Sequence, residues 1–287
     1  MTPDMPLSWT CPSCGREEPG TRFCSACGER RLTDRDRTLA GLLGQWSESL
    51  LHVDGRILRT CLTLVRAPGA LTVAYVAGRR KPFVGPFQLF IAINVAFFIV
   101  QSLSRLAILS TPLNVHLTGM SYRALAQLMV NAHLAKHGTT LAVYAPVFDA
   151  REGAIAKSLV ILMVLALAAV GGLVFCRRRL PVPTHVVFAL HFYAFMLLFL
   201  TFFFPVLALT LLALVGAGVH ITAPVVDNIA TAIEVAAIGG YLFVSLPKVY
   251  GGGHWARLSG TVVLTAAVGL VFYAYRFVVF WLTLLTT

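Results

Sequence analysis

Charged side chains are scarce in this sequence. Only 12% of its 287 residues are Asp, Glu, Lys or Arg, whereas soluble globular chains carry about 25%. Hydrophobic residues make up 57% of the chain, and the mean hydropathy is +0.79. This composition excludes a soluble globular domain. Because lipid offers the backbone no hydrogen-bonding partners, we expect an all-α integral membrane protein.

The sequence also lacks a secretory signal peptide and the common catalytic motifs. The opening segment, MTPDMPLSWTCPSCG, shows no positive region followed by an apolar core, so we expect the N-terminus to stay in the cytoplasm. There is no P-loop, GxSxG or HExxH sequence and no pair of carboxylates at a workable spacing. We therefore favour a non-catalytic role and assign no catalytic or cofactor-binding residue.

Cysteine is rare as well, but four of the six cysteines form the pattern C-x2-C-x9-C-x2-C: Cys11, Cys14, Cys24 and Cys27. A two-residue gap lets both thiolates of a pair reach one ion, and Gly15 and Gly28, which follow the pairs, can take the positive φ that such a turn needs. Four thiolates suit a structural Zn²⁺ ion without an open coordination site. Residues 1–35 are therefore predicted to be a four-cysteine zinc ribbon, here called the head. Iron and two disulfides are the alternatives, and a cytoplasmic location disfavours disulfides.

Basic residues surround these cysteines and bear on the partner of the head. Four thiolates on Zn²⁺ leave a net charge of −2, which nearby arginines can offset: Arg16, Arg22, Arg30 and Arg31. The same arginines could contact nucleic acid or an acidic partner. Trp9 and Phe23 are the only aromatic residues near them and make no stacking platform, so nucleic acid is disfavoured. A cytoplasmic protein is the partner we expect for the head.

Residues 36–84, here called the collar, combine helical apolar spacing with many arginines. A first helix is expected from the spacing of Leu39, Leu42, Leu43, Trp46 and Leu50. Asp54 is the expected N-cap of a second helix, which places Ile57, Leu58, Cys61, Leu62 and Val65 on an apolar face and arginines opposite. Pro68-Gly69 ends that helix, and a shorter one with Leu71, Ala74 and Tyr75 ends at Gly78.

The collar helices have two interpretations. Amphipathic helices with an arginine face and no full span lie in the membrane interface. Alternatively, their apolar faces pack on the head or on the membrane helices. Under the first interpretation, the candidates for lipid-headgroup contacts are Arg56, Arg59, Arg66, Arg79, Arg80 and Lys81.

Residues 85–287 are predicted to form a transmembrane helical domain. Its apolar runs predict five spans, at about 85–103, 155–176, 184–204, 229–246 and 259–285. An outer segment, 105–153, separates the first two spans and has helical spacing between Tyr122 and Ala132. The third run continues past Pro205 to about Val219, so the chain either crosses once with an extension or crosses twice; we favour one crossing.

The distribution of positive charge sets the expected orientation. Twelve of the 23 lysines and arginines precede residue 85, and three more follow the second expected span at Arg177–Arg179. Cytoplasmic loops carry an excess of such residues. Five spans then place the N-terminus inside and the C-terminus outside.

Polar residues inside the spans are candidates for function or for helix pairing. Glu234 and Arg276 are expected at similar depth in the outer half of neighbouring spans, and we predict that they form an ion pair. This pair could serve as a substrate gate or polar binding site, or it could be structural. His191 is expected to hydrogen-bond another helix, and Asn94 to join helices. His185 and His191 are six residues apart and do not share a helical face.

Four segments of this sequence carry a resemblance: CPSCG…FCSACGE, DGRILRT…RAPG…YVAGRRKPFVGPFQLFI, HVVFALHFYAF and YLFVSLPKVYG. Together they resemble a bacterial family of zinc-ribbon-headed multi-pass inner-membrane proteins of unknown function. The collar segment is the most specific of the four. The resemblance implies a location in the bacterial inner membrane and supplies no activity.

Three hypotheses of function follow. The leading one is a non-catalytic transport, lipid-interacting or scaffold protein with membrane lipids as partners, with a homo-oligomer as a further expectation. The second is a membrane-embedded enzyme acting on lipids, in which His185, His191, Glu234 or Asp227 would converge with a nucleophile or metal. The third is a zinc-ribbon regulator that binds nucleic acid at the membrane.

Overall fold

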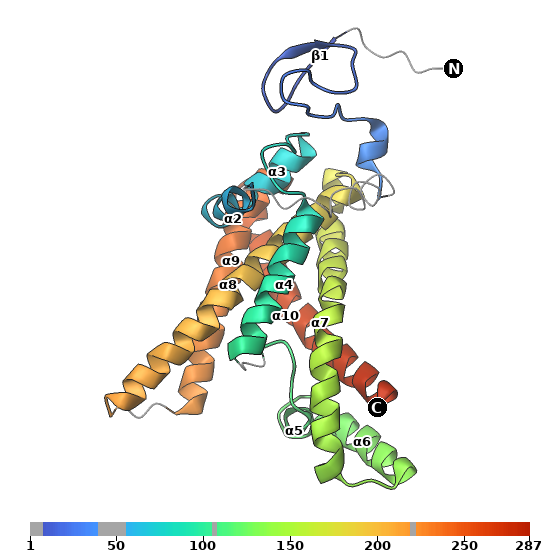
Figure 1. The fold of residues 1–287 in the computed structure, drawn as a ribbon, viewed down its shortest axis with the longest axis vertical. Helices are drawn as coiled ribbons and strands as arrows, with labels where there is room; N and C mark the ends of the chain where they lie inside the picture. Colours follow the sequence, from blue (N-terminus) through green and yellow to red (C-terminus); the bar gives the residue numbers. More distant parts are fainter. Residues whose placement is uncertain (1–7, 40–55, 105–107, 219–221) are drawn as a thin grey trace. The chain divides into compact units, whose positions relative to one another are not determined.

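The structure is a computed structural model that describes residues 8–39, 56–104, 108–218 and 222–287. Almost all of its regular structure is helical, which confirms the prediction of an all-α membrane protein. The order of the elements along the chain can be followed in Figure 1. Residues 40–55 lie outside the described residues. They include most of the helix expected at Leu39–Leu50 and the expected N-cap, Asp54.

The head contains the strands of the described chain. β1 (Ser8–Thr10) and β2 (Glu17–Pro19) pair antiparallel, with Trp9 opposite Glu18. A single bridge joins Phe23 to Arg30 further along the chain. A short 3₁₀ helix, η1 (Asp34–Arg37), follows.

Five helices among the described residues are long and apolar enough to cross a membrane. They are α4 (Pro86–Ser104), α7 (Leu141–Val174), α8 (Val182–Gly216), α9 (Ala223–Tyr250) and α10 (His254–Thr286). A short 3₁₀ helix, η2 (Cys176–Arg178), lies between α7 and α8. The prediction of about five membrane helices is confirmed.

Four of these helices, α7 to α10, are longer than the predicted spans, and α7 and α8 exceed them most. α7 begins at Leu141 and includes Pro146, so the last part of the expected outer segment belongs to it. α8 continues through Pro205 to Gly216 without a turn. A proline removes a single helical hydrogen bond, and membrane helices tolerate this. The chain therefore does not reverse at Pro205, which supports one crossing over two.

The rest of the expected outer segment is also helical. α5 (Leu113–Thr118) and α6 (Arg123–His137) precede α7. α6 confirms the helix predicted from the spacing between Tyr122 and Ala132.

The chain divides into two compact units. Unit 1 comprises Met1–Phe97 and Ala168–Thr265, and it contains the head, the collar, α8 and α9. Unit 2 comprises Phe98–Leu167 and Ala266–Thr287. The core of unit 2 is a cluster of buried side chains: Leu113, Ala126, Val130, Tyr144, Phe148, Phe280 and Leu284.

The described part of the collar is a pair of short helices within unit 1. α2 (Arg56–Arg66) and α3 (Ala70–Val76) are bent by 118° at Pro68-Gly69, as the sequence predicts. α3 packs against α8 and α9, and its Leu71, Thr72 and Ala74 are buried. Lys248 of α9 donates a hydrogen bond to the Pro68 carbonyl at 3.1 Å. The bend therefore lies against α9.

Gly69 makes this close approach possible. Its φ is +82°, and a Cβ at this position would lie 3.0 Å from the Cα of Ser245 in α9. Any side chain would meet both left-handed strain and a fixed backbone.

We predict that Gly69→Ala destabilises unit 1. Left-handed strain costs about 1 to 2 kcal/mol, and overpacking against a backbone adds roughly 1 to 3 kcal/mol. Gly138→Ala is the matched control, because Gly138 also has a positive φ, +60°, but no atom within 4 Å of the added Cβ. The measurement is the thermal unfolding midpoint of the purified protein in detergent. Equal midpoints for the two variants would contradict the close approach to Ser245.

Candidate functional site

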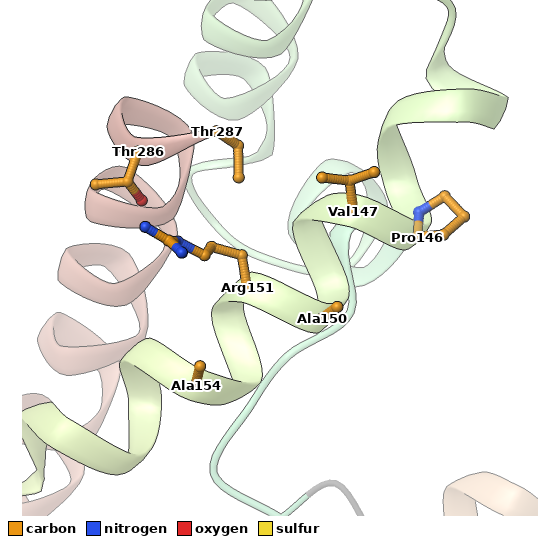
Figure 2. A pocket seen from close by; sticks show the side chains of 7 residues that line it. All are labelled: Pro146, Val147, Ala150, Arg151, Ala154, Thr286 and Thr287. Atoms are coloured by element: carbon orange, nitrogen blue, oxygen red, sulfur yellow. The ribbon is translucent and has the colours of Figure 1, made fainter.

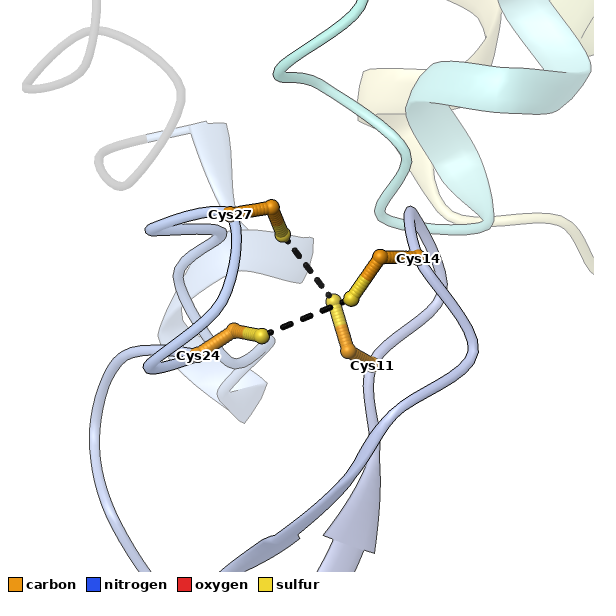
Figure 3. Close-up of side chains that lie close together, drawn as sticks. All are labelled: Cys11, Cys14, Cys24 and Cys27. Carbon is orange, nitrogen blue, oxygen red and sulfur yellow. Dashed lines mark hydrogen bonds between the residues drawn. The ribbon is translucent and has the colours of Figure 1, made fainter.

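The four cysteines of the pattern converge in the head. All four are free thiols, and their sulfur atoms lie within 4.8 Å of one another. Cys11 Sγ lies 3.5 Å from Cys27 Sγ, and Cys14 Sγ lies 3.6 Å from Cys24 Sγ. Figure 3 shows the four sulfur atoms pointing toward one another. Among the described residues, this is the one group of three or more His, Cys, Asp or Glu side chains that could hold a metal ion.

The spacing of the sulfur atoms fits a tetrahedral metal ion. A Zn–S bond of about 2.3 Å places two ligand sulfurs about 3.8 Å apart in a tetrahedron, close to both measured pairs. Such an ion, bound by four thiolates, would supply folding energy to a head that has little apolar core.

The two cysteine turns have the same backbone hydrogen bonds. Gly15 N–H donates to the Cys11 carbonyl at 2.8 Å, and Gly28 N–H donates to the Cys24 carbonyl at 2.9 Å. Gly15 has φ +75° and Gly28 has φ +69°, which confirms the prediction that these glycines take positive φ. Burial opposes ionisation of Cys11, but hydrogen bonds from the Cys14 and Ser13 amides lower the pKa of its thiol to about 7. A lower pKa favours the thiolate that a metal requires.

Glu18 supports the second cysteine turn. Its buried carboxylate accepts hydrogen bonds from Ser25 Oγ at 2.8 Å and from the Ser25 amide at 3.0 Å. Arg16 Nε lies 3.9 Å from the same carboxylate. The hydrogen bond from the Ser25 hydroxyl is the main cause of a lowered pKa at Glu18. This carboxylate is therefore held ionised beside the cysteines.

Glu29 connects the head to the collar. Its buried carboxylate Oε2 accepts hydrogen bonds from Ser13 Oγ at 2.6 Å, from the Arg80 amide at 3.0 Å and from the Lys81 amide at 2.9 Å. Ser13 lies inside the first cysteine turn, and Arg80 and Lys81 lie shortly before α4. We call this set of three hydrogen bonds the head–collar bridge. It joins the turn that carries two cysteines to the backbone that enters the first membrane helix.

Asp36 forms a second connection. Its buried carboxylate pairs with Arg30 and lies 3.8 Å from Arg80. Burial raises the pKa of Asp36, but hydrogen bonds from Thr33 and the two arginines outweigh burial and lower it below its usual range. The ionised form therefore stabilises the fold at neutral pH. That contribution is lost as the pH falls below about 4 and through the pKa of the folded state.

The collar arginines differ in what they contact. Arg80 lies over the Tyr75 ring, 4.4 Å from its centroid, as well as near Asp36. Arg56 donates to the Lys81 carbonyl at 3.0 Å. Four of the six candidates for lipid contacts have exposed side chains: Arg59, Arg66, Arg79 and Lys81. A role in lipid binding stays a prediction for these residues.

A cavity of about 280 Å³ lies where the collar meets the start of α8. Leu32 lines it from the head and Thr184 from α8, and the collar contributes Asp36, Tyr75 and Arg80. The Asp36–Arg80 pair is therefore next to a hollow of molecular size.

The two histidines of α8 are buried and have hydrogen-bond partners on different helices. His191 Nδ1 lies 2.9 Å from Thr72 Oγ1 of α3. This contact is a hydrogen bond to another helix, as expected from the sequence for His191. His185 Nδ1 lies 3.1 Å from Tyr250 Oη of α9, and the rings stack. Neither histidine has a carboxylate or thiol partner in the described ranges. These contacts favour a structural role for both.

The remaining intramembrane candidates lie in different units. Asn94 and Glu234 are half-buried in unit 1, on α4 and α9. Arg276 belongs to unit 2, where its guanidinium lies 4.6 Å from the centroid of the Phe272 ring. The Glu234–Arg276 ion pair stays a prediction.

Unit 2 holds a buried polar cluster that the sequence does not reveal. His116 Nδ1 lies 2.8 Å from Tyr122 Oη, and His116 Nε2 lies 3.2 Å from Glu152 Oε1. The Thr111 amide donates to Glu152 Oε1 at 3.0 Å. Burial, with a smaller contribution from Glu152, raises the pKa of Tyr122 to about 12. His116 and Glu152 are far apart in sequence and match no motif, so no local signal predicts their contact.

A second hollow, about 760 Å³, lies on unit 2 where α7 faces the end of α10. Figure 2 shows Arg151 extending from α7 toward Thr286, with Pro146 and Val147 on the preceding turn. Its lining carries one charged side chain and no acidic group. It therefore offers little to a catalytic mechanism.

The comparisons with known proteins address the collar. Residues 54–98 match a family described as "Protein of unknown function (DUF3667)". The matched stretch contains α2, α3 and the first part of α4, and it coincides with the most specific part of the resemblance seen in the sequence. No curated protein and no solved structure matches the chain.

We predict that the head binds about one Zn²⁺ ion per chain. Cys14→Ser or Cys24→Ser should lower the metal content to under about a tenth, because three thiolates and a hydroxyl hold the ion poorly. Cys61→Ser and Cys176→Ser are the controls, since neither residue belongs to the cluster. Atomic emission of the purified protein measures the metal. Equal loss in the controls, or full retention in Cys24→Ser, would contradict the site.

We also predict that Thr72→Val destabilises the protein by about 1 to 3 kcal/mol, because it leaves the buried His191 imidazole without its partner. Thr63→Val is the control, because the Thr63 hydroxyl is bonded to its own helix, at the Arg59 carbonyl. Unfolding in denaturant, followed by tryptophan fluorescence, measures the difference. Equal stability of the two variants would show that the Thr72–His191 contact contributes nothing.

Proposed function

We propose that this chain is a non-catalytic inner-membrane protein whose zinc-bound head braces the collar. The observation that carries the proposal is the head–collar bridge. The Glu29 carboxylate is buried and accepts hydrogen bonds from Ser13, Arg80 and Lys81. Removing any of these donors leaves a buried charge less well compensated. The fold of the head and the path of the collar therefore depend on each other.

Zn²⁺ is the ion that fits this role best. Four thiolates with no oxygen or nitrogen ligand among them suit a closed, structural Zn²⁺ site. When bound, the ion would hold both cysteine turns in place and so position Ser13 and Glu29. Glu18 and Glu29 then orient the turns from outside the cluster.

The orientation follows from charge. The head and collar hold 12 of the 23 lysines and arginines, and Arg177–Arg179 lie between α7 and α8. Basic segments favour the cytoplasmic side. With α4 as the first of five crossings, the head lies in the cytoplasm and the C-terminus lies outside. This arrangement accounts for the net charge of +11 without a nucleic-acid partner.

We predict that Glu29→Ala exposes the backbone before α4 to protease. The bridge holds the amide nitrogens of the Arg79–Arg80 and Arg80–Lys81 peptide bonds, which trypsin would cleave. Losing these hydrogen bonds should raise the rate of cleavage at the two peptide bonds about tenfold. This factor corresponds to a decrease of roughly 1.4 kcal/mol in the free energy of opening this backbone to the protease. Tryptic digestion of the protein in vesicles, read by mass spectrometry, measures the rate.

Glu17→Ala is the control for this experiment, because Glu17 is exposed on the same strand as Glu18. Metal content is measured in parallel, so that a head that still binds Zn²⁺ is known to be folded. Unchanged cleavage in a metal-loaded Glu29→Ala protein would refute bracing of the collar by the head.

A further inference from the structure

α2 exposes an apolar stripe. Its buried side chains are Thr60 and Leu64, which face the rest of unit 1. Leu58, Leu62 and Val65 lie on another side of the helix and are 69%, 42% and 49% exposed. These three positions repeat at four and three residues, which places them in one line along the helix. The stripe is therefore available to contact lipid.

An apolar groove continues this stripe onto α8. Its volume is about 370 Å³, and its lining presents no polar surface. Val65 of α2 lines it together with a row of residues on one face of α8: Phe195, Leu198, Phe199, Phe202, Phe203 and Val206. From residue 195 to residue 206 this row extends about 16 Å along the helix.

Phenylalanine rings form much of the groove lining. The rings of Phe195 and Phe199 stack with their centroids 6.4 Å apart, and those of Phe199 and Phe203 stack at 5.1 Å. Because α8 is apolar enough to span a membrane, we expect this groove to face hydrocarbon rather than water. A saturated hydrocarbon chain matches both its surface and its length.

Positive charge lies on α2 next to Val65, the residue of α2 that lines the groove. Arg66 follows Val65 directly, and Arg59 is two turns earlier on the same side of α2; both side chains are exposed. Neither guanidinium has an acidic partner within residues 8–39, 56–104, 108–218 and 222–287. An anion at this position would gain two charge-assisted contacts.

We propose that this site binds an anionic phospholipid, with one acyl chain in the groove of α8 and the phosphate at Arg66 and Arg59. A second copy of this chain would bring further arginines to the same place and is disfavoured by the net charge of +11. The site is independent of the head–collar bridge, so either proposal can fail alone.

The test uses the full chain in detergent micelles with added phospholipid. A phosphatidylglycerol that carries a photoreactive group on one acyl chain is compared with the matching phosphatidylcholine. Crosslinks should concentrate on the peptide that contains residues 195–206. Each arginine near an anionic headgroup strengthens binding about fivefold, so the two together should make phosphatidylglycerol bind roughly 25-fold better than phosphatidylcholine.

Variants separate the headgroup contact from the groove. Arg59→Gln/Arg66→Gln should remove the preference for phosphatidylglycerol. The matched control is Arg177→Gln/Arg179→Gln, which removes two exposed charges between α7 and α8 and should leave the preference in place. Val65→Trp should fill the groove and lower crosslinking to residues 195–206 at least about fivefold. The thermal unfolding midpoint of each purified variant in detergent shows that it is folded.

Three results would overturn the proposal. Crosslinks spread evenly over the spans would show that the groove is not a lipid site. If both double variants lost the preference for phosphatidylglycerol equally, that preference would come from general surface charge and not from Arg59 and Arg66. Crosslinks between two chains through Phe199 or Phe202 would show that a second copy occupies the groove.

Discussion

The carboxylate of Glu29 is the constraint on which the described arrangement of head and collar depends. A buried carboxylate is stable only where hydrogen bonds replace its water. Ser13, Arg80 and Lys81 supply those bonds from two segments that are far apart in the chain. One segment is shaped by the cysteine cluster, and the other enters α4. A single acidic side chain therefore makes the backbone before the first membrane helix sensitive to the fold of the head.

The collar is held on its other side by the membrane helices. α3 packs on α8 and α9, Thr72 contacts His191, and Gly69 allows the bend to approach Ser245. These contacts fix α3 rather than α2, whose Leu58, Leu62 and Val65 stay exposed. The packing interpretation therefore holds for α3, and the interfacial interpretation stays a prediction for α2. α3 packs on the membrane helices, and α2 keeps an apolar stripe beside two arginines.

Local patterns in the sequence predict a large part of this structure. The cysteine spacing predicts the cluster, Pro68-Gly69 predicts the bend, and long apolar runs predict five helices, because each depends on residues close together in the chain. The Glu29 contacts and the His116–Glu152 pair are not predictable in this way, because their partners are distant and carry no motif. The start of α7 is also missed, since Pro146 and several charged residues interrupt the apolar run where the helix continues.

We predict that Zn²⁺ bound in the head controls the conformation of the collar backbone. Hydrogen–deuterium exchange of the full chain in vesicles, read on the peptide that covers residues 79–84, tests this most directly. With Zn²⁺ bound, the amides of Arg80 and Lys81 should exchange slowly, because Glu29 accepts their hydrogen bonds. Removal of the metal by a chelator should speed their exchange at least about tenfold while the α8 peptide around His191 stays protected. Unchanged exchange at residues 79–84 after complete metal loss would contradict the account.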